Sequence, residues 1–594
     1  MRHMMKYVKK YGLLFIVSVL LVSIEALGDL LQPTMMSHIV DEGVANKQMD
    51  TVLRFGGWML LITLGGALAA SGRNIVSSIV SQRFGAELRQ DLFEKIQGLS
   101  FESVDRYDRA SLVTRLTNDV TQVQNFVNGM MRIFVKAPML CIGGFVMAFR
   151  LNPYLSIVLM IVIPIVGLMI VLNMKVGLPL FLKVQNALDR LNGVMREYLS
   201  GVRVVKAFNR FDLEVGKFNG INKQYESRAI SAQRVMAVFS PGVTLTMNIG
   251  IVAVIWLGGI RVNSGHTQVG HIIAFVNYMT QILFSLTTMT MIFNMFVRAK
   301  ASTGRIVEVL AEVNTMENHS TPMPMQSMQS MQSMQSMQSM QGKGAIEFDN
   351  VSFSYEGPDG EPVLKSISFT CQPGETLAII GSTGSGKSTL VNLIPRFYDV
   401  TEGSVKINGV NIRDLDTHEL REKIGIVPQK SILFTGPVID NLRIGKQDAS
   451  VDEVVEAAKM ASAHSFISEL PEQYNTLIGQ GGVNFSGGQK QRISIARALI
   501  RKPEILILDD CTSALDSATE ASIKRAINEY AKDVTCLLIA QRISSVKDAN
   551  TILVMDDGEI VGMGSHDSLL QTCHVYQEIY RSQIGKEVDN HASA

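Results

Sequence analysis

The chain contains 594 residues, which is too long for a single compact core and predicts two or more domains. Its 55 basic and 54 acidic residues leave a formal net charge of +1, so overall charge gives no reason to expect nucleic acid as a partner. Five cysteines are too few for a disulfide scaffold in a chain of this length, and they indicate a reducing environment for most of the protein.

Nearly all the long apolar runs lie before residue 300, whereas the remainder has the character of a soluble α/β domain. This division excludes both an ordinary cytosolic enzyme and a purely membrane-embedded channel. Six runs are long enough to cross about 30 Å of hydrocarbon as a helix, which takes about 20 residues. They lie near residues 12–32, 53–72, 132–150, 153–173, 238–260 and 270–297. No small-residue cleavage site follows the first run, which is therefore expected to be a retained span and not a secretory signal.

Charge predicts the orientation of these spans. The acidic segment 33–52 is expected outside, whereas 73–131 and 174–236 are rich in Arg and Lys and are expected in the cytoplasm. An even number of spans returns the chain to the cytoplasm after residue 298. We therefore predict a multi-pass protein of the cell membrane, embedded in the lipid bilayer, with its N- and C-termini in the cytoplasm.

The two cytoplasmic segments are much longer than ordinary loops, and their apolar residues recur with helical spacing. The spans are expected to continue as helices into the cytoplasm, with a short helix at each of two breaks, 100–115 and 201–212. These segments are either connecting structure or levers that contact the soluble domain. Their length favours levers.

Glu25, Asp29 and Lys136 are charged residues within the predicted spans. Glu25 and Asp29 lie one helical turn apart and share a face. Intramembrane carboxylates are costly and usually functional, although these two could also lie near the outer interface and pair with a neighbouring helix. Lys136 lies at the cytoplasmic end of the third span, where it is expected to extend toward the interface.

A repeat of Met-Gln-Ser from Met325 to Gln341 separates the two halves. Its period of three fits neither a helix nor a strand, so we predict a flexible, low-complexity linker without an assigned function. The predicted organisation is a transmembrane domain over 1–312, a linker over 313–344, a soluble domain over 345–585 and a tail over 586–594.

The first motif of the soluble half follows a buried strand at 377–380. It fits the phosphate-binding pattern G-x-x-x-x-G-K-[ST] and runs directly into an apolar helix start. The matching residues are Gly381, Ser382, Thr383, Gly384, Ser385, Gly386, Lys387, Ser388 and Thr389. Glycines allow the backbone N–H groups to face phosphates, Lys387 adds a point charge, and the Ser388 hydroxyl can ligate Mg²⁺.

A second buried strand, 505–508, ends at Asp509, an acid placed to hold the Mg²⁺ shell. Between the two motifs, a Ser-Gly-Gly turn precedes a basic helix. Its four residues are Ser486, Gly487, Gly488 and Gln489. Alone this turn is an ordinary helix start, but its position between two phosphate motifs makes it much more specific.

With these motifs, the soluble half resembles the nucleotide-binding domain of ATP-binding cassette (ABC) transporters. The whole chain outside the Met-Gln-Ser tract resembles a half-transporter of the bacterial multidrug exporter type. The resemblance implies an all-α transmembrane domain of six long helices joined to an α/β P-loop domain, located in the bacterial cytoplasmic membrane. It also implies ATP and Mg²⁺ as cofactors and a second half-transporter as partner.

The resemblance further implies roles for individual positions. Tyr355 corresponds to the aromatic residue that stacks on adenine, and Gln429 to the glutamine that reaches Mg²⁺ and the attacking water. The turn from Ser486 to Gln489 corresponds to the signature motif, and the segment from Ser513 to Asp516 to a dimer-contacting loop. Coupling helices would fall near 103–115 and 205–215.

Two positions depart from the family pattern, and both are catalytic. The family normally has Glu where this chain has Asp510, and His where this chain has Gln541. Asp510 is one methylene shorter, and misplacing a carboxylate by about an ångström can cost about 10²-fold in rate. Gln541 can donate a hydrogen bond but cannot carry a positive charge.

These features lead to the hypothesis of one subunit of a heterodimeric exporter that moves amphipathic or hydrophobic compounds. Its partner would be a related chain with Glu and His at the two catalytic positions. A homodimer that hydrolyses slowly with Asp510 is the simpler alternative. A lipid, peptide or siderophore transporter on the same fold, and an ATP-gated regulatory or channel subunit that does not pump, also remain open.

Overall fold

The computed structural model describes residues 2–313, 316, 344–511, 517–530 and 534–591. Contacts divide the chain into two units, the first formed by Met1–Gly98 with Asp108–Glu312 and the second by Leu99–Tyr107 with Val313–Ala594. Apart from residues 313, 316 and 344, the predicted linker lies outside the described residues, as does the loop from Ser513 to Asp516.

The first unit is built from long helices. Their bounds are α1 Arg2–His38, α2 Met49–Gln97, α4 Arg109–Thr114, α5 Val120–Gly129, α6 Lys136–Leu151, α7 Ser156–Ala207, α8 Phe211–Asn263 and α9 Val269–Ala311. Among the described residues, six helical segments are long and apolar enough to cross a membrane. Each covers one predicted span, except that residues 153–155 form a turn before α7, so the six spans are confirmed.

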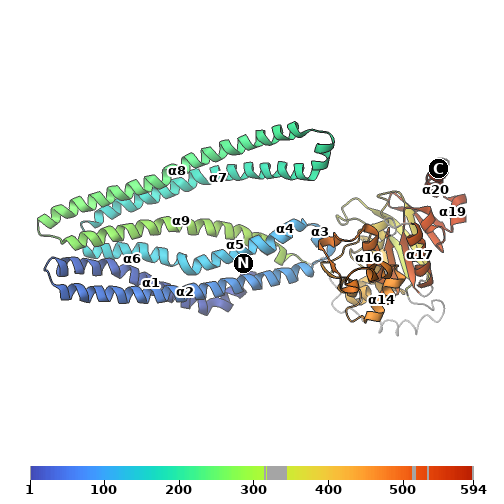
Figure 1. Cartoon of the computed structure of the whole chain (residues 1–594), viewed down its shortest axis with the longest axis horizontal. Coiled ribbons are helices and arrows are strands. Elements are labelled where there is room, and N and C mark those ends of the chain that lie inside the picture. Colours follow the sequence, from blue (N-terminus) through green and yellow to red (C-terminus); the bar gives the residue numbers. More distant parts are fainter. Residues whose placement is uncertain (1, 314–315, 317–343, 512–516, 531–533, 592–594) are drawn as a thin grey trace. The chain divides into compact units, whose positions relative to one another are not determined.

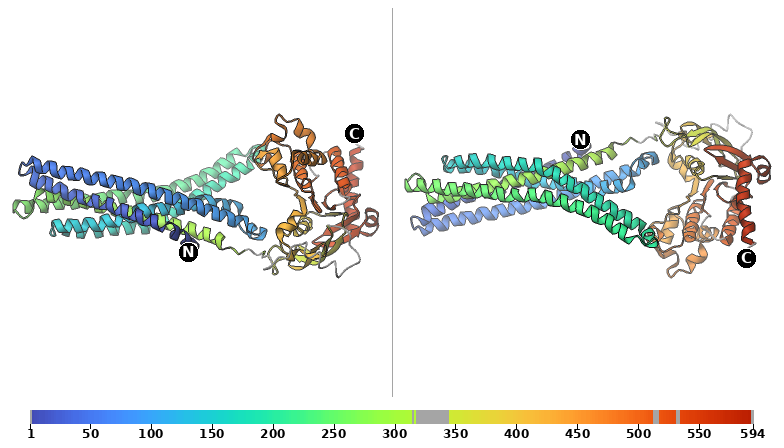
Figure 2. Two further views of the ribbon diagram at one scale, coloured as in Figure 1. Left: turned by 90° about the horizontal axis from the view of Figure 1, so that it is seen from below. Right: turned by 90° about the horizontal axis from the view of Figure 1, so that it is seen from above.

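α1 and α2 lie side by side, as do α7 and α8, and the second pair diverges from the other long helices toward its connecting turn (Figures 1 and 2). The helices extend far beyond the predicted spans, as the amphipathic pattern of the cytoplasmic segments indicated. The short helix expected within 201–212 is absent: these residues form the end of α7, a turn and the beginning of α8.

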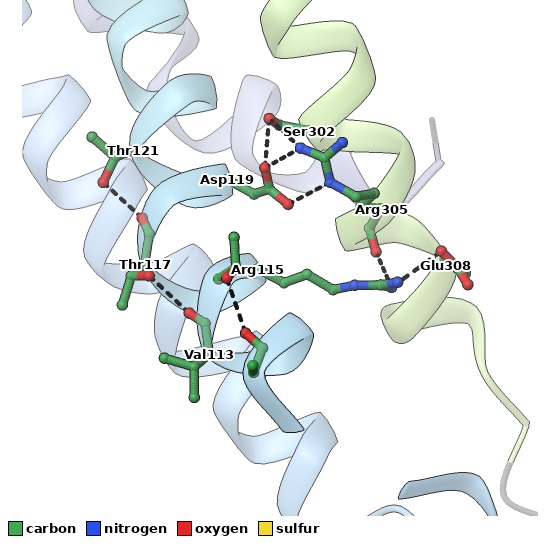
Figure 3. Close-up of polar contacts among 10 residues, drawn as sticks. Val113, Arg115, Thr117, Asp119, Thr121, Ser302, Arg305 and Glu308 are labelled. Carbon is green, nitrogen blue, oxygen red and sulfur yellow. Dashed lines mark hydrogen bonds and ion pairs between the residues drawn. The ribbon is translucent and has the colours of Figure 1, made fainter. Parts of the chain in front are cut away.

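Among the described residues, the π-helical segment η1 Ile39–Val44 ends α1, whereas η2 Arg115–Asp119 and η3 Met130–Phe134 lie on either side of α5. Such wide turns are rare and often lie at functional positions. At η2, the buried Asp119 carboxylate accepts hydrogen bonds from Arg305 Nε at 2.7 Å and from Ser302 Oγ at 2.8 Å (Figure 3). Arg115 donates to the Arg305 carbonyl at 2.8 Å, so η2 is hydrogen-bonded to the last turns of α9 (Figure 3).

The second unit is an α/β domain that also includes the short helix α3 Phe101–Asp105. The expectation of a short helix within 100–115 therefore holds for α3. Its Phe101 ring lies 4.6 Å from the Phe397 ring, and Tyr398 Oη donates to Asp105 Oδ2 at 2.6 Å. This segment contacts the soluble domain, as the lever interpretation requires.

Two main sheets and a small ribbon form the domain. An antiparallel sheet has the order β2-β1-β4-β5, a six-stranded sheet has the order β12-β11-β3-β10-β9-β6, and β7 pairs with β8. The strands are β1 Ile346–Phe353, β2 Leu364–Cys371, β3 Thr376–Gly381, β4 Glu402–Ile407, β5 Val410–Asn411, β6 Ile424–Val427, β7 Gly436–Pro437, β8 Leu477–Ile478, β9 Ile505–Asp509, β10 Thr535–Ile539, β11 Thr551–Asp556 and β12 Glu559–Gly564.

Helices cover the six-stranded sheet and follow several of its strands. They are α11 Lys387–Leu393, α12 Thr417–Glu422, α13 Val438–Arg443, α14 Val451–Met460, α15 His464–Ser468, α16 Gly487–Leu499, α17 Ser517–Tyr530, α18 Ile543–Val546, α19 His566–Thr572 and α20 His574–His591. α20 continues into 586–591, part of the predicted tail.

The central strands of the six-stranded sheet are apolar except at their ends, because both faces of the sheet are covered. On β9, Ile505 and Ile507 pack in the core shared with α11 and the antiparallel sheet, whereas Leu506 and Leu508 pack in the core shared with α14 and α16. β11, β3, β10, β9 and β6 run parallel. Their carboxyl ends therefore meet at one edge, where ligands bind in folds of this kind.

Candidate functional site

The loop between β3 and α11 has the conformation that a phosphate-binding turn requires. β3 ends at Gly381 and α11 begins at Lys387, so the predicted strand, loop and helix are present. Gly384 and Gly386 have φ values of +89° and +91°, which side chains other than glycine rarely tolerate. This backbone path turns successive N–H groups toward one point at the beginning of the helix, where an anion is stabilised.

The Lys387 side chain lies against the backbone of this loop. Its Nζ donates to the carbonyl oxygens of Gly381 at 3.1 Å and Ser382 at 2.5 Å. Burial lowers the pKa of Lys387, and the nearby negative charges of Asp509 and Asp510 oppose that effect. The ammonium group is thus held over the loop, where bound phosphates would provide stronger partners than the carbonyls.

Ser388 and Asp509, the predicted metal ligands, lie together. Ser388 Oγ donates to Asp509 Oδ1 at 3.1 Å. Burial raises the pKa of Asp509, the Ser388 hydrogen bond lowers it, and the charge of Asp510 raises it further. A hydroxyl and one carboxylate fit Mg²⁺, which retains several waters and uses few protein ligands at phosphate sites. The described residues contain no cluster of three or more His, Cys, Asp or Glu side chains that would indicate a different metal site.

Asp510 is held in place by both backbone and side-chain contacts. Its φ of +44° is unusual for a residue other than glycine, and its N–H donates to the Ile539 carbonyl at 3.0 Å. Asp510 Oδ2 accepts hydrogen bonds from Gln429 Nε2 at 3.3 Å and Gln541 Nε2 at 3.0 Å. Burial raises the pKa of Asp510, whereas the two glutamine hydrogen bonds lower it.

The contact between Asp510 and Gln541 changes how the two departures from the family pattern are understood. In the sequence the two positions are 31 residues apart and nothing links them. In the structure, Asp510 follows β9 and Gln541 follows its parallel neighbour β10, and the two side chains are hydrogen-bonded donor to acceptor. They therefore form one coupled arrangement.

A single cavity collects most of the predicted site residues. It is lined by Val363, Thr383, Gly384, Gly386, Lys387, Ser388, Thr389, Gln429, Asp509, Asp510, Ile539 and Gln541. Sequence patterns did not indicate Val363 and Ile539, because an apolar residue beside a phosphate loop has no motif of its own. Ser382 lies at the rim, where its Oγ donates to Asp556 Oδ1 at 3.0 Å.

Tyr355 lies next to the phosphate loop and is 44% exposed. Its hydroxyl is 3.0 Å from Thr389 Oγ1, and its ring packs edge-on against Phe353 and Tyr398. A supported aromatic ring with an exposed face is a stacking platform for a base.

The Ser-Gly-Gly-Gln turn begins α16 but is not among the residues that line this cavity. Ser486 Oγ accepts from the Gln489 N–H at 3.3 Å, and Gln489 Oε1 accepts from the Ser486 N–H at 2.9 Å. These reciprocal bonds form a capping box, which fixes the helix start. Within one chain, the structure does not bring this turn to the phosphate loop.

Comparison with known proteins gives matches over both halves. The ABC transporter transmembrane region matches residues 15–286, and the ABC transporter family matches residues 364–513. An uncharacterized ABC transporter ATP-binding protein, YfiB of Bacillus subtilis, is 39% identical over 587 residues, covering 99% of each chain. An ATP-dependent lipid A-core flippase of Syntrophus aciditrophicus is 34% identical and covers 87% of this chain and 84% of the relative.

The fold also matches a solved structure, that of a bacterial Atm1-family ABC exporter with ATP bound. The TM-score is 0.77, with 24% sequence identity, and the match covers 97% of this chain and 98% of the other. The arrangement of six long helices and an α/β domain is therefore the type I exporter fold.

Proposed function

The chain belongs to the ABC transporter family as a half-transporter of the exporter type, and we propose that it is the hydrolysis-impaired subunit of a heterodimeric exporter. In this proposal, the chain binds Mg-ATP at its own phosphate loop and hydrolyses it poorly. Its signature turn completes a second, competent site whose catalytic Glu and His belong to the partner chain. The compounds moved are amphipathic or hydrophobic.

One observation carries the proposal: the Asp510 carboxylate is held by two amide donors, Gln429 and Gln541. A general base must reach the attacking water and accept its proton. Here Oδ2 already accepts two hydrogen bonds, and the Asp side chain is one methylene shorter than the Glu of the family. Gln541 can donate to a phosphate oxygen but cannot provide positive charge. Each feature favours nucleotide binding over hydrolysis.

The residues that would bind nucleotide fit that role. Lys387 and the loop N–H groups would hold the phosphates, Ser388 and Asp509 would ligate Mg²⁺ together with Gln429, and Tyr355 would stack on the base. When bound, Mg²⁺ neutralises charge on the phosphates. The position of Ser486 to Gln489 outside the cavity favours a sandwich of two chains, in which each signature turn faces the other chain's loop.

A lipid carrier is the second candidate, favoured by the similarity to a protein named as a lipid A-core flippase. No contact among the described residues distinguishes peptide or siderophore transport from lipid transport. Transport of a compound across a membrane distinguishes each of these transporters from a regulatory subunit that binds ATP without pumping. Inverted membrane vesicles containing a transporter would concentrate a fluorescent amphipathic compound when supplied with ATP, and vesicles containing a regulator would not.

The proposal is tested by measuring which nucleotide remains bound to the purified dimer. The chain, copurified with a partner bearing Glu and His, is incubated with radiolabelled Mg-ATP, freed of unbound nucleotide and analysed for bound ATP and ADP. We expect one unhydrolysed ATP per dimer, lost when Lys387→Ala is introduced in this chain but kept when the equivalent lysine of the partner is changed. Conversion of both bound nucleotides to ADP would contradict the proposal.

A further inference from the structure

Glu25, Asp29 and Lys136 are paired within the membrane-spanning unit. Lys136 Nζ lies 2.6 Å from Glu25 Oε1 and 2.8 Å from Asp29 Oδ2, and Arg73 Nη1 lies 2.7 Å from Glu25 Oε2. Lys136 therefore does not extend alone to the interface, as the sequence suggested, but bridges both carboxylates of α1. The pairing alternative for Glu25 and Asp29 is the one observed. A different contact, within the soluble domain, bears on the nucleotide cavity.

The helix α20 contacts the loop that carries Gln541. Gln583 Oε1 accepts a hydrogen bond from the Ile543 N–H, and Gln583 Nε2 donates to the Gln541 carbonyl oxygen, each at 2.8 Å. The two bonded backbone groups lie on either side of Arg542, whose backbone is extended, with φ −103° and ψ 133°. A side-chain amide has the donor and the acceptor of a peptide group, so Gln583 pairs with this extended residue as a neighbouring strand would.

The Ile543 N–H is a group that α18 cannot satisfy by itself. It is the first N–H of that helix, and the first four N–H groups of a helix have no partner within it. Arg542, which precedes the helix, makes no capping hydrogen bond with its side chain. Gln583 therefore supplies, from 40 positions further along the chain, the acceptor that the local sequence lacks.

Apolar packing holds α20 against the same loop. Ala540 and Ile543, at the two ends of the loop, are buried in one apolar core with Tyr576 of α20. Ile579, also on α20, packs against that core. Tyr576, Ile579 and Gln583 follow one another at spacings of three and four residues, so they lie on one face of the helix. The position of Gln583 is therefore set by a buried helix face.

The side chain of Gln541 reaches from this loop into the nucleotide cavity. It lines the cavity together with the phosphate loop, and its Nε2 donates to Asp510 Oδ2 at 3.0 Å. Because Gln583 bonds the backbone carbonyl of the same residue, the place from which the Gln541 side chain starts depends on α20. Gln583 is not among the residues that line the cavity, so any effect it has on bound nucleotide passes through Gln541.

We propose that Gln583 is a positioning residue, which holds Gln541 where its side-chain amide can donate to the terminal phosphate of bound ATP. ADP lacks this phosphate, so the contact strengthens the binding of ATP and not that of ADP. The inference rests on the part of the proposed function that assigns Mg-ATP to this cavity, and it applies to a heterodimer and a homodimer alike. It gives α20 a part in distinguishing ATP from ADP.

The test compares the affinities of the full-length chain, in nanodiscs, for Mg-ADP and for a nonhydrolysable analogue of Mg-ATP. Each is measured by displacement of a fluorescent ADP. In Gln583→Ala, we expect the ATP analogue to bind about fivefold more weakly, as for the loss of one hydrogen bond, and ADP affinity to stay within about twofold. Gln541→Ala should show the same difference, and adding Gln583→Ala to it should cause no further loss.

Gln577→Ala is the matched control. Gln577 lies on the same helix, and its Nε2 donates to the Leu570 carbonyl at 2.8 Å, a bond of the same kind made to α19. Its replacement should change neither affinity. If Gln583→Ala does not fold, Gln583→Glu at about pH 8 replaces it, because an ionised carboxylate has nearly the same size but cannot donate to the Gln541 carbonyl. The same fivefold weakening of ATP analogue binding is expected.

Several outcomes would overturn the inference. Unchanged affinity for the ATP analogue in the Gln583 variants, or in Gln541→Ala, would mean that the contact with the terminal phosphate does not exist. An equal loss in Gln577→Ala, a matching loss of ADP affinity, or a loss that persists beside Gln541→Ala would indicate a purely structural role. Failure of the proposed function has a different result, which would remove the inference with it: the unmodified chain would bind neither nucleotide, or Lys387→Ala would leave both affinities unchanged.

Discussion

At the scale of single residues, the account depends on the hydrogen bond between Gln541 and Asp510. The Asp at position 510 and the Gln at position 541 each replace a catalytic residue that the family normally has. Because Gln541 Nε2 lies 3.0 Å from Asp510 Oδ2, the two positions share one interaction and their effects should not be independent.

A double-mutant cycle tests this coupling. ATPase rates are measured for Asp510→Glu, Gln541→His and the double variant, each assembled with the same partner. We expect the double variant to gain more than the product of the two single gains, by at least about twofold, because contacting residues couple by about 0.5 kcal/mol or more. Rates that multiply independently would show that the contact has no catalytic consequence.

Tyr355 gives a second test at this scale. Stacking of a base on an aromatic side chain contributes about 1–3 kcal/mol, so Tyr355→Ala should weaken ATP binding about tenfold or more, whereas Tyr355→Phe should retain most of the affinity. Equilibrium binding of a fluorescent nucleotide measures both. Equal affinity in the alanine variant would mean that the adenine lies elsewhere.

At the scale of elements, the contact between η2 and α9 links the segment from α4 to α5 to the helix that precedes the soluble domain in the sequence. Asp119 is buried and accepts from both Arg305 and Ser302 (Figure 3). The Arg305 side chain is 48% exposed, so water can reach it once its partner is gone, and the loss of the charge-assisted hydrogen bonds at Asp119 should cost about 1.5–3 kcal/mol. Asp119→Ala should therefore lower the thermal unfolding midpoint, and it should reduce the amount of compound transported per ATP hydrolysed.

Glu308→Gln is the matched control for Asp119→Ala. Glu308 pairs with Arg115 in the same cluster, but its side chain is 55% exposed. Arg115 is buried, but it keeps its hydrogen bond to the Arg305 carbonyl, and the amide oxygen that Glu308→Gln introduces can still accept from it. This variant should therefore behave like the unmodified chain in both assays. If Asp119→Ala left both measurements unchanged as well, the cluster would not couple the two helices.

The elements also show which features the sequence could predict. The six spans and the phosphate loop follow from local patterns, apolar length in one case and glycine spacing in the other. The extension of the helices beyond the spans also follows from a local pattern, the helical spacing of apolar residues in the segments between them. The π-helical segments were not foreseen, since no composition marks them, and the bridge from Lys136 to Glu25 and Asp29 depends on how α1 and α6 meet.

The candidate site shows the same limit. Lys387, Ser388 and Asp509 could be predicted because motif and strand position fix them together. The contact between Asp510 and Gln541 depends on β9 and β10 being adjacent parallel strands, a pairing that spans 31 positions of sequence. The strand order that creates this contact is a property of the sheet and not of either motif.

At the scale of the whole molecule, the phosphate loop and the Ser486 turn do not line one common cavity among the described residues. The cavity at the sheet edge holds the phosphate loop, the metal ligands and Asp510, whereas the capped turn at Ser486 lies outside it. The type I exporter fold supplies the explanation, because half-transporters of this family act in pairs. In the proposed heterodimer, the chemical difference between the two composite sites would follow from which chain contributes Asp510 and Gln541.

The most direct measurement is the ATPase activity of this chain purified alone and again after coexpression with related half-transporters. The account predicts negligible turnover by the chain alone and strong turnover only beside a partner with Glu and His at the catalytic positions. It also predicts that Asp510→Glu with Gln541→His raises the activity of the chain alone. Robust turnover by the unmodified chain, abolished by Asp510→Asn, would contradict the account and identify a homodimer in which Asp510 is a working catalytic residue.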